Sequence, residues 1–171
     1  MDCLPSRSCR ALALPHDVMK LRKSPRLRDF DYVGPFAYSL TLVTRDRAPV
    51  FTEQATVGAT LGCLARSCDR YDFSLHAYCF MPDHLHVLVS GRGRSSLQAF
   101  VHHFKQLSGY RYKRKHGAHL WQISYYDHVL RSDEDLPAVA RYIWDNPVRV
   151  DLVEDWSAYP FSGPRSSIEQ A

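Results

Sequence analysis

The sequence lacks several features that would place it in whole classes of proteins. None of its apolar runs approaches the roughly 20 residues that a membrane-spanning helix needs, and the apolar patch at 11–14 is cut short by Pro15. We therefore expect no membrane segment, no signal peptide and a cytoplasmic location. The five cysteines are odd in number and match no zinc-ligand spacing, so we expect free thiols at positions 3, 9, 63, 68 and 79.

Strong net charge is also missing, as are repeats and low-complexity tracts. The formal net charge is +4 over 171 residues, of which 45% are hydrophobic, and this composition fits one globular domain with a buried core. Positive charge is nevertheless concentrated in two segments, KLRKSPRLR at 20–28 and RYKRK at 111–115. Such clusters often contact phosphates, although a solvated charged surface is the simpler explanation of either one alone.

The pattern of apolar residues predicts a single α+β domain. We expect an irregular arm over 1–34, a domain over 35–163 and a tail over 164–171. Strands are predicted at 36–44, 73–80, 84–90 and 124–131, and helices at 52–70, from 97 to Gly109 or a little beyond, and at 133–146, stopping before Pro147. This order indicates a largely antiparallel sheet with helices packed on one or more faces.

The first candidate site lies in the segment YCFMPDHLHVLVS at 78–90. His84 and His86 are separated by one residue in a predicted strand, so both side chains point to the same face, roughly 6.5–7 Å apart along the chain. Two imidazoles on one face can bind one metal ion, but two are too few to complete its coordination. Histidine-triad nucleotide hydrolases use a third histidine at the next alternate position, where this chain has Leu88, which argues against that class.

The second candidate site lies in the segment LPAVARYIWDNPVRVDLV at 136–153. Tyr142 and Asn146 are four residues apart on a predicted helix and share a face. An ordinary core or surface tyrosine is the alternative interpretation. If this helix lies against the histidine strand, His84, His86 and Asn146 can hold a divalent ion and Tyr142 can attack a phosphodiester, which would give a 5′-phosphotyrosine. Such a ligand set favours Mg²⁺ or Mn²⁺ over a closed zinc site.

Four stretches of the chain resemble the HUH-type single-tyrosine transposases and, within them, the REP-associated tyrosine transposases. They are RKSPRLRDFDY at 22–32, YCFMPDHLHVLV at 78–89, LWQISYYDHVLRSDEDL at 120–136 and ARYIWDNPVRVDLV at 140–153. The resemblance implies a ferredoxin-like fold with the histidine strand central in the sheet. It also implies that Tyr142 is the nucleophile and that His84, His86 and Asn146 bind the metal.

The same resemblance implies a partner and a reaction. Proteins of this kind act on single-stranded DNA that carries a hairpin or palindromic repeat, which predicts a DNA-nicking and strand-transfer enzyme acting as a monomer or a homodimer. In this family the basic arm helps read the DNA beside the hairpin. With that fold in mind, DNA contacts are predicted for Lys20, Arg22, Lys23, Arg26, Arg28, Lys105, Arg111, Lys113, Arg114 and Lys115.

Two other functions compete with the nickase. The first is a sequence-specific DNA-binding protein that keeps the fold but does not cut. The second is a hydrolase or phosphodiesterase of small nucleotides that uses the histidine pair alone. A covalent DNA adduct that depends on Tyr142 would distinguish the nickase from both.

Overall fold

The computed structural model describes residues 30–131 and 134–164. Its five strands form one antiparallel sheet in the order β4-β1-β3-β2-β5. The strands are β1 (Ala37–Val43), β2 (Phe73–Met81), β3 (His84–Gly91), β4 (Tyr126–Val129) and β5 (Ser162–Gly163). The histidine strand, β3, is the middle strand, as predicted.

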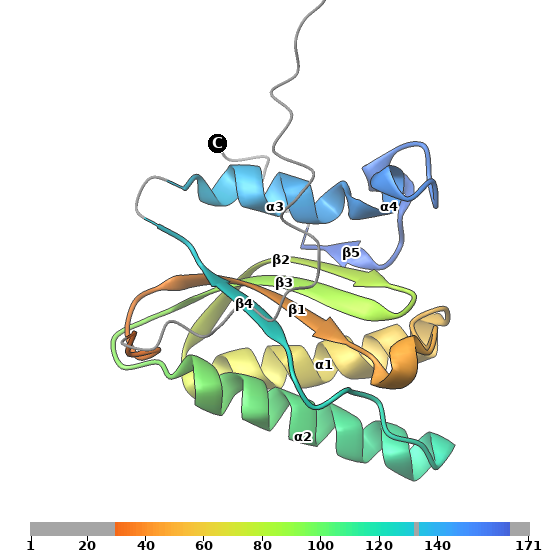
Figure 1. Ribbon diagram of the computed structural model, residues 1–171, viewed down its shortest axis with the longest axis horizontal. Helices are drawn as coiled ribbons and strands as arrows, with labels where there is room; N and C mark the ends of the chain where they lie inside the picture. Colours follow the sequence, from red (N-terminus) through yellow and green to blue (C-terminus); the bar gives the residue numbers. More distant parts are fainter. Residues whose placement is uncertain (1–29, 132–133, 165–171) are drawn as a thin grey trace, which may run out of the picture.

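Helices cover both faces of this sheet (Figure 1). On one face lie α1 (Gln54–Tyr71) and α2 (Leu97–His116), and on the other lies α3 (Leu136–Trp144), followed by the single turn α4 (Asn146–Arg149). The first four strands and the first two helices follow the βαββαβ order of ferredoxin-like folds. The predicted α+β class and ferredoxin-like architecture are therefore confirmed.

Two hydrophobic cores hold the layers together, and the alternation of side chains on β3 contributes to both. Leu85, Val87 and Val89 are buried in the larger core, together with residues of α1 and α2. Leu88 points the other way and is buried with Ile143 and Trp144 of α3. Because strand residues alternate between faces, His84 and His86 lie on the same face as Leu88, beneath α3.

Helix α2 extends further than the sequence suggested, to His116 rather than to the neighbourhood of Gly109. Gly109 is tolerated inside the helix at a cost of about 1 kcal/mol relative to alanine. The helix ends where Gly117 adopts the left-handed conformation (φ +70°) and its N–H donates to the carbonyl of Lys113. Thus the basic segment 111–115 is helical along its whole length.

The tyrosine helix differs from its predicted bounds at both ends. It begins at Leu136 after Asp135, and it breaks at Asp145 into α3 and α4. Pro147 does not terminate helical structure, because it lies in the first turn of α4. A backbone N–H in the first turn makes no hydrogen bond within the helix, so proline, which lacks this N–H, is tolerated there. β4 is also shorter than the predicted strand at 124–131, and the two-residue strand β5 was not predicted.

The chain before β1 joins the domain by packing and by main-chain hydrogen bonds. Tyr32 is buried in the larger core, and its carbonyl accepts a hydrogen bond from the N–H of Leu97 at 3.0 Å. Cys63, Cys68 and Cys79 are buried free thiols. None of the helices in the described ranges is long and apolar enough to cross a membrane.

Candidate active site

The two histidines of β3 converge at their ring nitrogens. The Nε2 atoms of His84 and His86 are 3.0 Å apart, and the two rings are nearly perpendicular. Two ligand atoms at about 2.1 Å from an octahedral ion lie about 3.0 Å apart when they are adjacent. The pair is therefore spaced as two neighbouring ligands of one divalent ion would be.

His86 is buried and neutral. Only 4% of its surface is exposed, and its Nδ1 lies 3.0 Å from the hydroxyl oxygen of Thr41 on the neighbouring strand. The pKa of His86 is lowered to about 3, mainly by burial and also by the nearby His84, while Asp83 partly opposes the shift. A neutral imidazole keeps a lone pair on one nitrogen, which is the form that binds a metal.

His84 is oriented by a carboxylate. Its Nδ1 lies 2.5 Å from Oδ1 of Asp83, and Oδ2 of Asp83 accepts a hydrogen bond from Arg47 at 2.9 Å. Burial raises the pKa of Asp83, but the hydrogen bonds and charges of His84 and Arg47 outweigh it and lower the pKa overall. Because a carboxylate can only accept, Nδ1 of His84 is the donor, and Nε2 is directed toward His86. Carboxylates commonly orient metal-binding histidines in this way.

The main chain holds Asp83 in place independently of its side chain. Its carbonyl accepts hydrogen bonds from both the N–H and the hydroxyl of Thr44, at 3.0 and 2.8 Å. Arg47 lies in the short 3₁₀ segment Arg45–Arg47, where Asp46 and Arg47 both have positive φ values, a conformation that non-glycine residues rarely adopt. This unusual turn brings the guanidinium of Arg47 to the carboxylate of Asp83.

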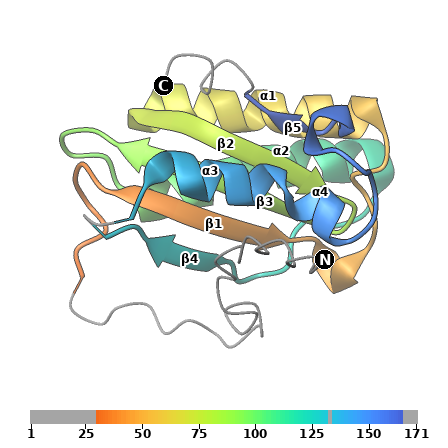
Figure 2. The ribbon, with the colours of Figure 1, turned by 90° about the horizontal axis from the view of Figure 1, so that it is seen from above.

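Helix α3 covers the sheet on the side of the histidine pair, as Figure 2 shows from above. Ile143 and Trp144 are buried against Leu88, and the indole N–H of Trp144 donates to the carbonyl of Gly163 at 3.0 Å. The condition that the sequence left open, that the tyrosine helix lies on the histidine face, is thus met.

Asn146 presents its amide oxygen rather than its amide nitrogen. Both hydrogens of its Nδ2 are directed to main-chain carbonyls, those of Tyr142 and Ile143, each at 3.1 Å. Only 7% of Asn146 is exposed, and its Oδ1 accepts no hydrogen bond from the described residues. An accessible acceptor without a hydrogen-bond partner suits a hard cation. No cluster of three or more His, Cys, Asp or Glu side chains that could hold a metal occurs in the described ranges.

Tyr142 lies one turn before Asn146 and is partly exposed. The guanidinium of Arg149 lies 4.5 Å from the centroid of its ring. Within 30–131 and 134–164, no hydrogen bond joins Tyr142 or Asn146 to the histidine pair. The structure thus places the four predicted residues on one side of the sheet as two separate pairs.

The predicted DNA contacts divide into several groups. The five basic residues at 20–28 lie outside the described residues. Lys105 is not free, because its ammonium donates to the carbonyls of Gln122 and Ile123, both at 2.8 Å, and burial lowers its pKa to about 8. Arg111 and Lys115 line a hollow between α2 and α1, whereas Lys113 lines a groove on the other side of α2. Arg114 lies against the ring of Tyr110.

Sequence reasoning did not identify Thr41, Asp83 or Arg47 as parts of the site. Asp83 carried a usable signal, because it directly precedes His84, but no role was predicted for it. Thr41 had no local signal, because its place beside His86 depends on the pairing of β1 with β3.

Comparison with known proteins shows which proteins this chain is similar to. The family model described as "Transposase IS200 like" matches residues 33–146, a span that contains all four predicted site residues. A Haemophilus influenzae protein named as a REP-associated tyrosine transposase is 28% identical over 145 residues, covering 75% of this chain and 80% of that protein.

Two solved structures have a similar fold. The structure of a REP-associated tyrosine transposase bound to a REP hairpin matches with a TM-score of 0.68 at 20% identity, covering 81% of this chain and 82% of that one. A structure assigned as a transposase from Deinococcus radiodurans matches with a TM-score of 0.50 at 23% identity, covering 68% of this chain and 92% of that one.

Proposed function

The chain belongs to the IS200-like transposase family, and on that basis we propose that it cuts and rejoins single-stranded DNA beside REP-like hairpins. The family membership confirms the resemblance seen in the sequence motifs and makes the chain a member of a family of DNA-processing enzymes. The choice of substrate is supported by the name of the Haemophilus relative and by the hairpin bound to the structural neighbour. We expect the basic arm at 20–28 to contact the same DNA, and the protein to act in the cytoplasm.

His84, His86 and Asn146 would hold the metal that this reaction requires. The 3.0 Å separation of the histidine nitrogens and the unpaired amide oxygen of Asn146 fit a divalent ion with mixed nitrogen and oxygen ligands. The three neutral ligands leave room for phosphate oxygens and water, which favours Mg²⁺ or Mn²⁺. When bound, such an ion would polarise a non-bridging oxygen of the phosphate.

Tyr142 would supply the nucleophile. Its phenolic oxygen, once deprotonated, forms a bond to phosphorus, while the bond from phosphorus to the 3′ oxygen breaks and the leaving group departs as a 3′-hydroxyl. The product is a 5′-phosphotyrosine and a free 3′ end. Attack of a 3′-hydroxyl on this linkage restores a phosphodiester and releases the tyrosine, so rejoining needs no external energy source.

One observation carries the proposal: the converging histidine pair lies on the face of the sheet that is covered by the helix bearing Tyr142. The direct test is to incubate the protein with labelled, hairpin-bearing single-stranded DNA and Mn²⁺. We expect a covalent protein–DNA adduct that survives denaturation. Tyr142→Phe should abolish it, whereas Tyr71→Phe, on α1 at the opposite face, should keep it.

The same experiment distinguishes the competing functions. Hairpin binding without an adduct, across different metals and substrates, would support a non-cleaving DNA-binding protein on this fold. Turnover of small nucleotides that persists in Tyr142→Phe would instead support a nucleotide hydrolase that uses the histidine pair.

A further inference from the structure

A positive charge lies against the ring of Tyr142 and has no part in the candidate metal site. The carbon at the centre of the Arg149 guanidinium is 4.5 Å from the centroid of this ring. A cation within about 6 Å of a ring is attracted by the negative charge of the ring face. Arg149 is exposed and Tyr142 is half-buried, so the side chain of Arg149 covers the tyrosine from the solvent side.

The sequence places this arginine in line with the two functional residues of the same segment. Tyr142, Asn146 and Arg149 are spaced by four and then three residues, which puts them on one face of a helix. Asp145, at the junction of α3 and α4, has nearly helical φ and ψ values of −77° and −9°, so this face continues across the break. The N–H of Arg149 donates to the carbonyl of Asp145 at 3.0 Å, which holds the main chain of Arg149 in the last turn.

Arg149 is the side chain that restrains the ring of Tyr142. Within residues 30–131 and 134–164, the phenolic oxygen makes no hydrogen bond, and no other aromatic ring stacks on this one. No carboxylate in the same ranges forms an ion pair with Arg149. The guanidinium therefore keeps its full charge while it limits the rotation of the tyrosine ring.

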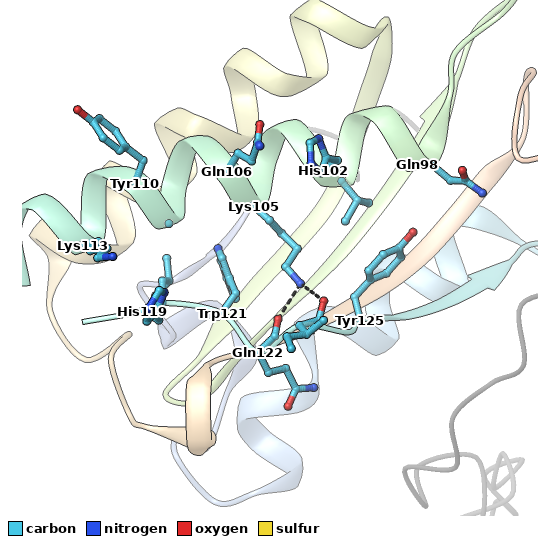
Figure 3. A pocket seen from close by; sticks show the side chains of 14 residues that line it. Gln98, His102, Lys105, Gln106, Tyr110, Lys113, His119, Trp121, Gln122 and Tyr125 are labelled. Carbon is cyan, nitrogen blue, oxygen red and sulfur yellow. Dashed lines mark hydrogen bonds between the residues drawn. The ribbon is translucent and has the colours of Figure 1, made fainter. Parts of the chain in front are cut away.

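Other tyrosine rings in the described part of the chain also lie near cations, but none lies so close. The rings of Tyr71 and Tyr110 are each 5.8 Å from a guanidinium. Tyr125 is 6.0 Å from the ammonium of Lys105, which donates to main-chain carbonyls (Figure 3). Among these tyrosines, the candidate nucleophile thus has the nearest positive charge.

The proposed reaction changes the charge on the phenolic oxygen of Tyr142. The phenol gives its proton to solvent, and the oxygen forms a bond to phosphorus while the bond from phosphorus to the 3′ oxygen breaks. The departing 3′ oxygen takes a proton from solvent. Rejoining reverses these steps, so the phenolic oxygen is then the leaving group. In both directions this oxygen carries negative charge in the transition state, which it carries in neither the phenol nor the phosphotyrosine.

A guanidinium fixed beside the ring stabilises this developing charge. Opposite charges a few ångströms apart attract one another, and a charge that is already in place needs no reorganisation during the reaction. The transition state gains more from Arg149 than the phenol or the phosphotyrosine does. Arg149 should therefore lower the barrier equally for cutting and rejoining, and leave the balance between cut and joined DNA unchanged.

We propose that Arg149 is a positioning residue for Tyr142, which orients its ring and stabilises negative charge on its phenolic oxygen during cutting and rejoining. The inference rests on the proposed function, because it takes Tyr142 as the nucleophile. Loss of Arg149 should slow the chemistry in both directions without weakening the recognition of DNA.

The test measures two rates at saturating labelled hairpin DNA and Mn²⁺. Cutting is followed as formation of the adduct, and rejoining as loss of the isolated adduct when a strand with a 3′-hydroxyl is added. Arg149→Met removes the charge and should slow both rates by a similar factor, about 3- to 30-fold, as expected for one cation–π contact. Arg149→Lys keeps the charge and should restore part of both rates. Arg141→Met is the matched control, because the neighbouring Arg141 lies over the ring of Trp156 instead, and it should change neither rate.

Binding is measured separately, in proteins that carry Tyr142→Phe and cannot cut. Adding Arg149→Met to this background should change the affinity for the hairpin no more than adding Arg141→Met. A loss of affinity confined to Arg149→Met would overturn the inference, because Arg149 would then contact the DNA rather than act on the tyrosine.

The rates can also contradict the inference. Unchanged rates in Arg149→Met, slowing in one direction only, or no recovery in Arg149→Lys would each overturn it. In all these cases the adduct formed by the unaltered chain would leave the proposed function standing. Failure of the unaltered chain to form any adduct would overturn the proposed function and the inference together.

Discussion

Replacing Asp83 by asparagine tests whether the carboxylate orients His84 for metal binding. The change keeps the size of the side chain but removes the charge that accepts from Nδ1 of His84. An asparagine can rotate its amide nitrogen toward the imidazole and so favour the wrong tautomer. Losing such an outer partner of a metal-binding histidine typically costs about 10- to 100-fold in metal affinity or activity.

The fold should tolerate this substitution. The ion pair of Asp83 with Arg47 is partly exposed to solvent and is worth about 1 kcal/mol. The turn between β2 and β3 is held by main-chain bonds that remain, including those from Phe51 to the carbonyl of Pro82 and from Thr44 to that of Asp83. We therefore expect a nearly unchanged free energy of unfolding.

The assay is the yield of covalent adduct as a function of Mn²⁺ concentration. Asp83→Asn should need about 10- to 100-fold more Mn²⁺ for half of the maximal yield, at unchanged affinity for the hairpin. Glu134→Gln is the matched control, because Glu134 also binds a histidine, His128, at 2.9 Å but lies away from the pair. An unaltered Mn²⁺ requirement in Asp83→Asn, or a parallel loss of hairpin binding, would refute the reasoning.

Three further predictions address the site and the two faces of the sheet. His84→Ala should abolish the adduct while a gel shift still shows most of the hairpin binding; loss of both would indicate a structural role instead. Leu88→Ala should lower the free energy of unfolding, measured in urea, by about 2–5 kcal/mol, since Leu88 is fully buried under α3. Val150→Ala, at an exposed position, should change it by less than about 0.5 kcal/mol. Lys105→Met should alter the pH dependence of stability: burial lowers the pKa of Lys105 from 10.5 to about 8, so between these values the unfolded chain holds a proton that the folded chain has lost. As the pH rises through this window, the unaltered chain should therefore gain stability relative to the variant. Below the window, stability should change with pH equally in the two proteins. Thermal unfolding at a series of pH values measures both. If the stabilities of the two proteins change in parallel with pH across this window, the ammonium of Lys105 is not buried in the way the structure shows.

The features that the sequence predicted well are those that depend on local geometry. Alternation along a strand is enough to place His84 and His86 on one face, and their nitrogens do converge. The same alternation places Leu85 and Val87 in the opposite core. Periodicity identified the helices and most of the strands, but not their ends, because Gly109 and Pro147 signal a helix end only in some contexts.

The residues around the histidine pair could not be predicted because they depend on contacts between distant segments. Thr41 is 45 positions from His86 and meets it only through the register of β1 on β3. Arg47 reaches Asp83 through a turn with an uncommon backbone conformation, which no composition rule indicates. Lys105 was predicted to contact DNA, but its ammonium is occupied by carbonyls that the fold brings to it.

Asn146 was predicted from the sequence as a metal ligand, but the sequence did not show how its side-chain amide would be oriented. Pro147 was interpreted only as the residue before which the helix stops. In a continuous helix the N–H of residue 147 would donate to the carbonyl of Ile143, and proline has no such N–H. The side-chain amide of Asn146 donates to that carbonyl instead, and to the carbonyl of Tyr142 as well. Because these bonds occupy both amide hydrogens, they fix the orientation of the amide and leave Oδ1 as the exposed acceptor. The pair Asn146-Pro147 therefore does more than break this helix, because it also fixes the direction of the amide oxygen of Asn146.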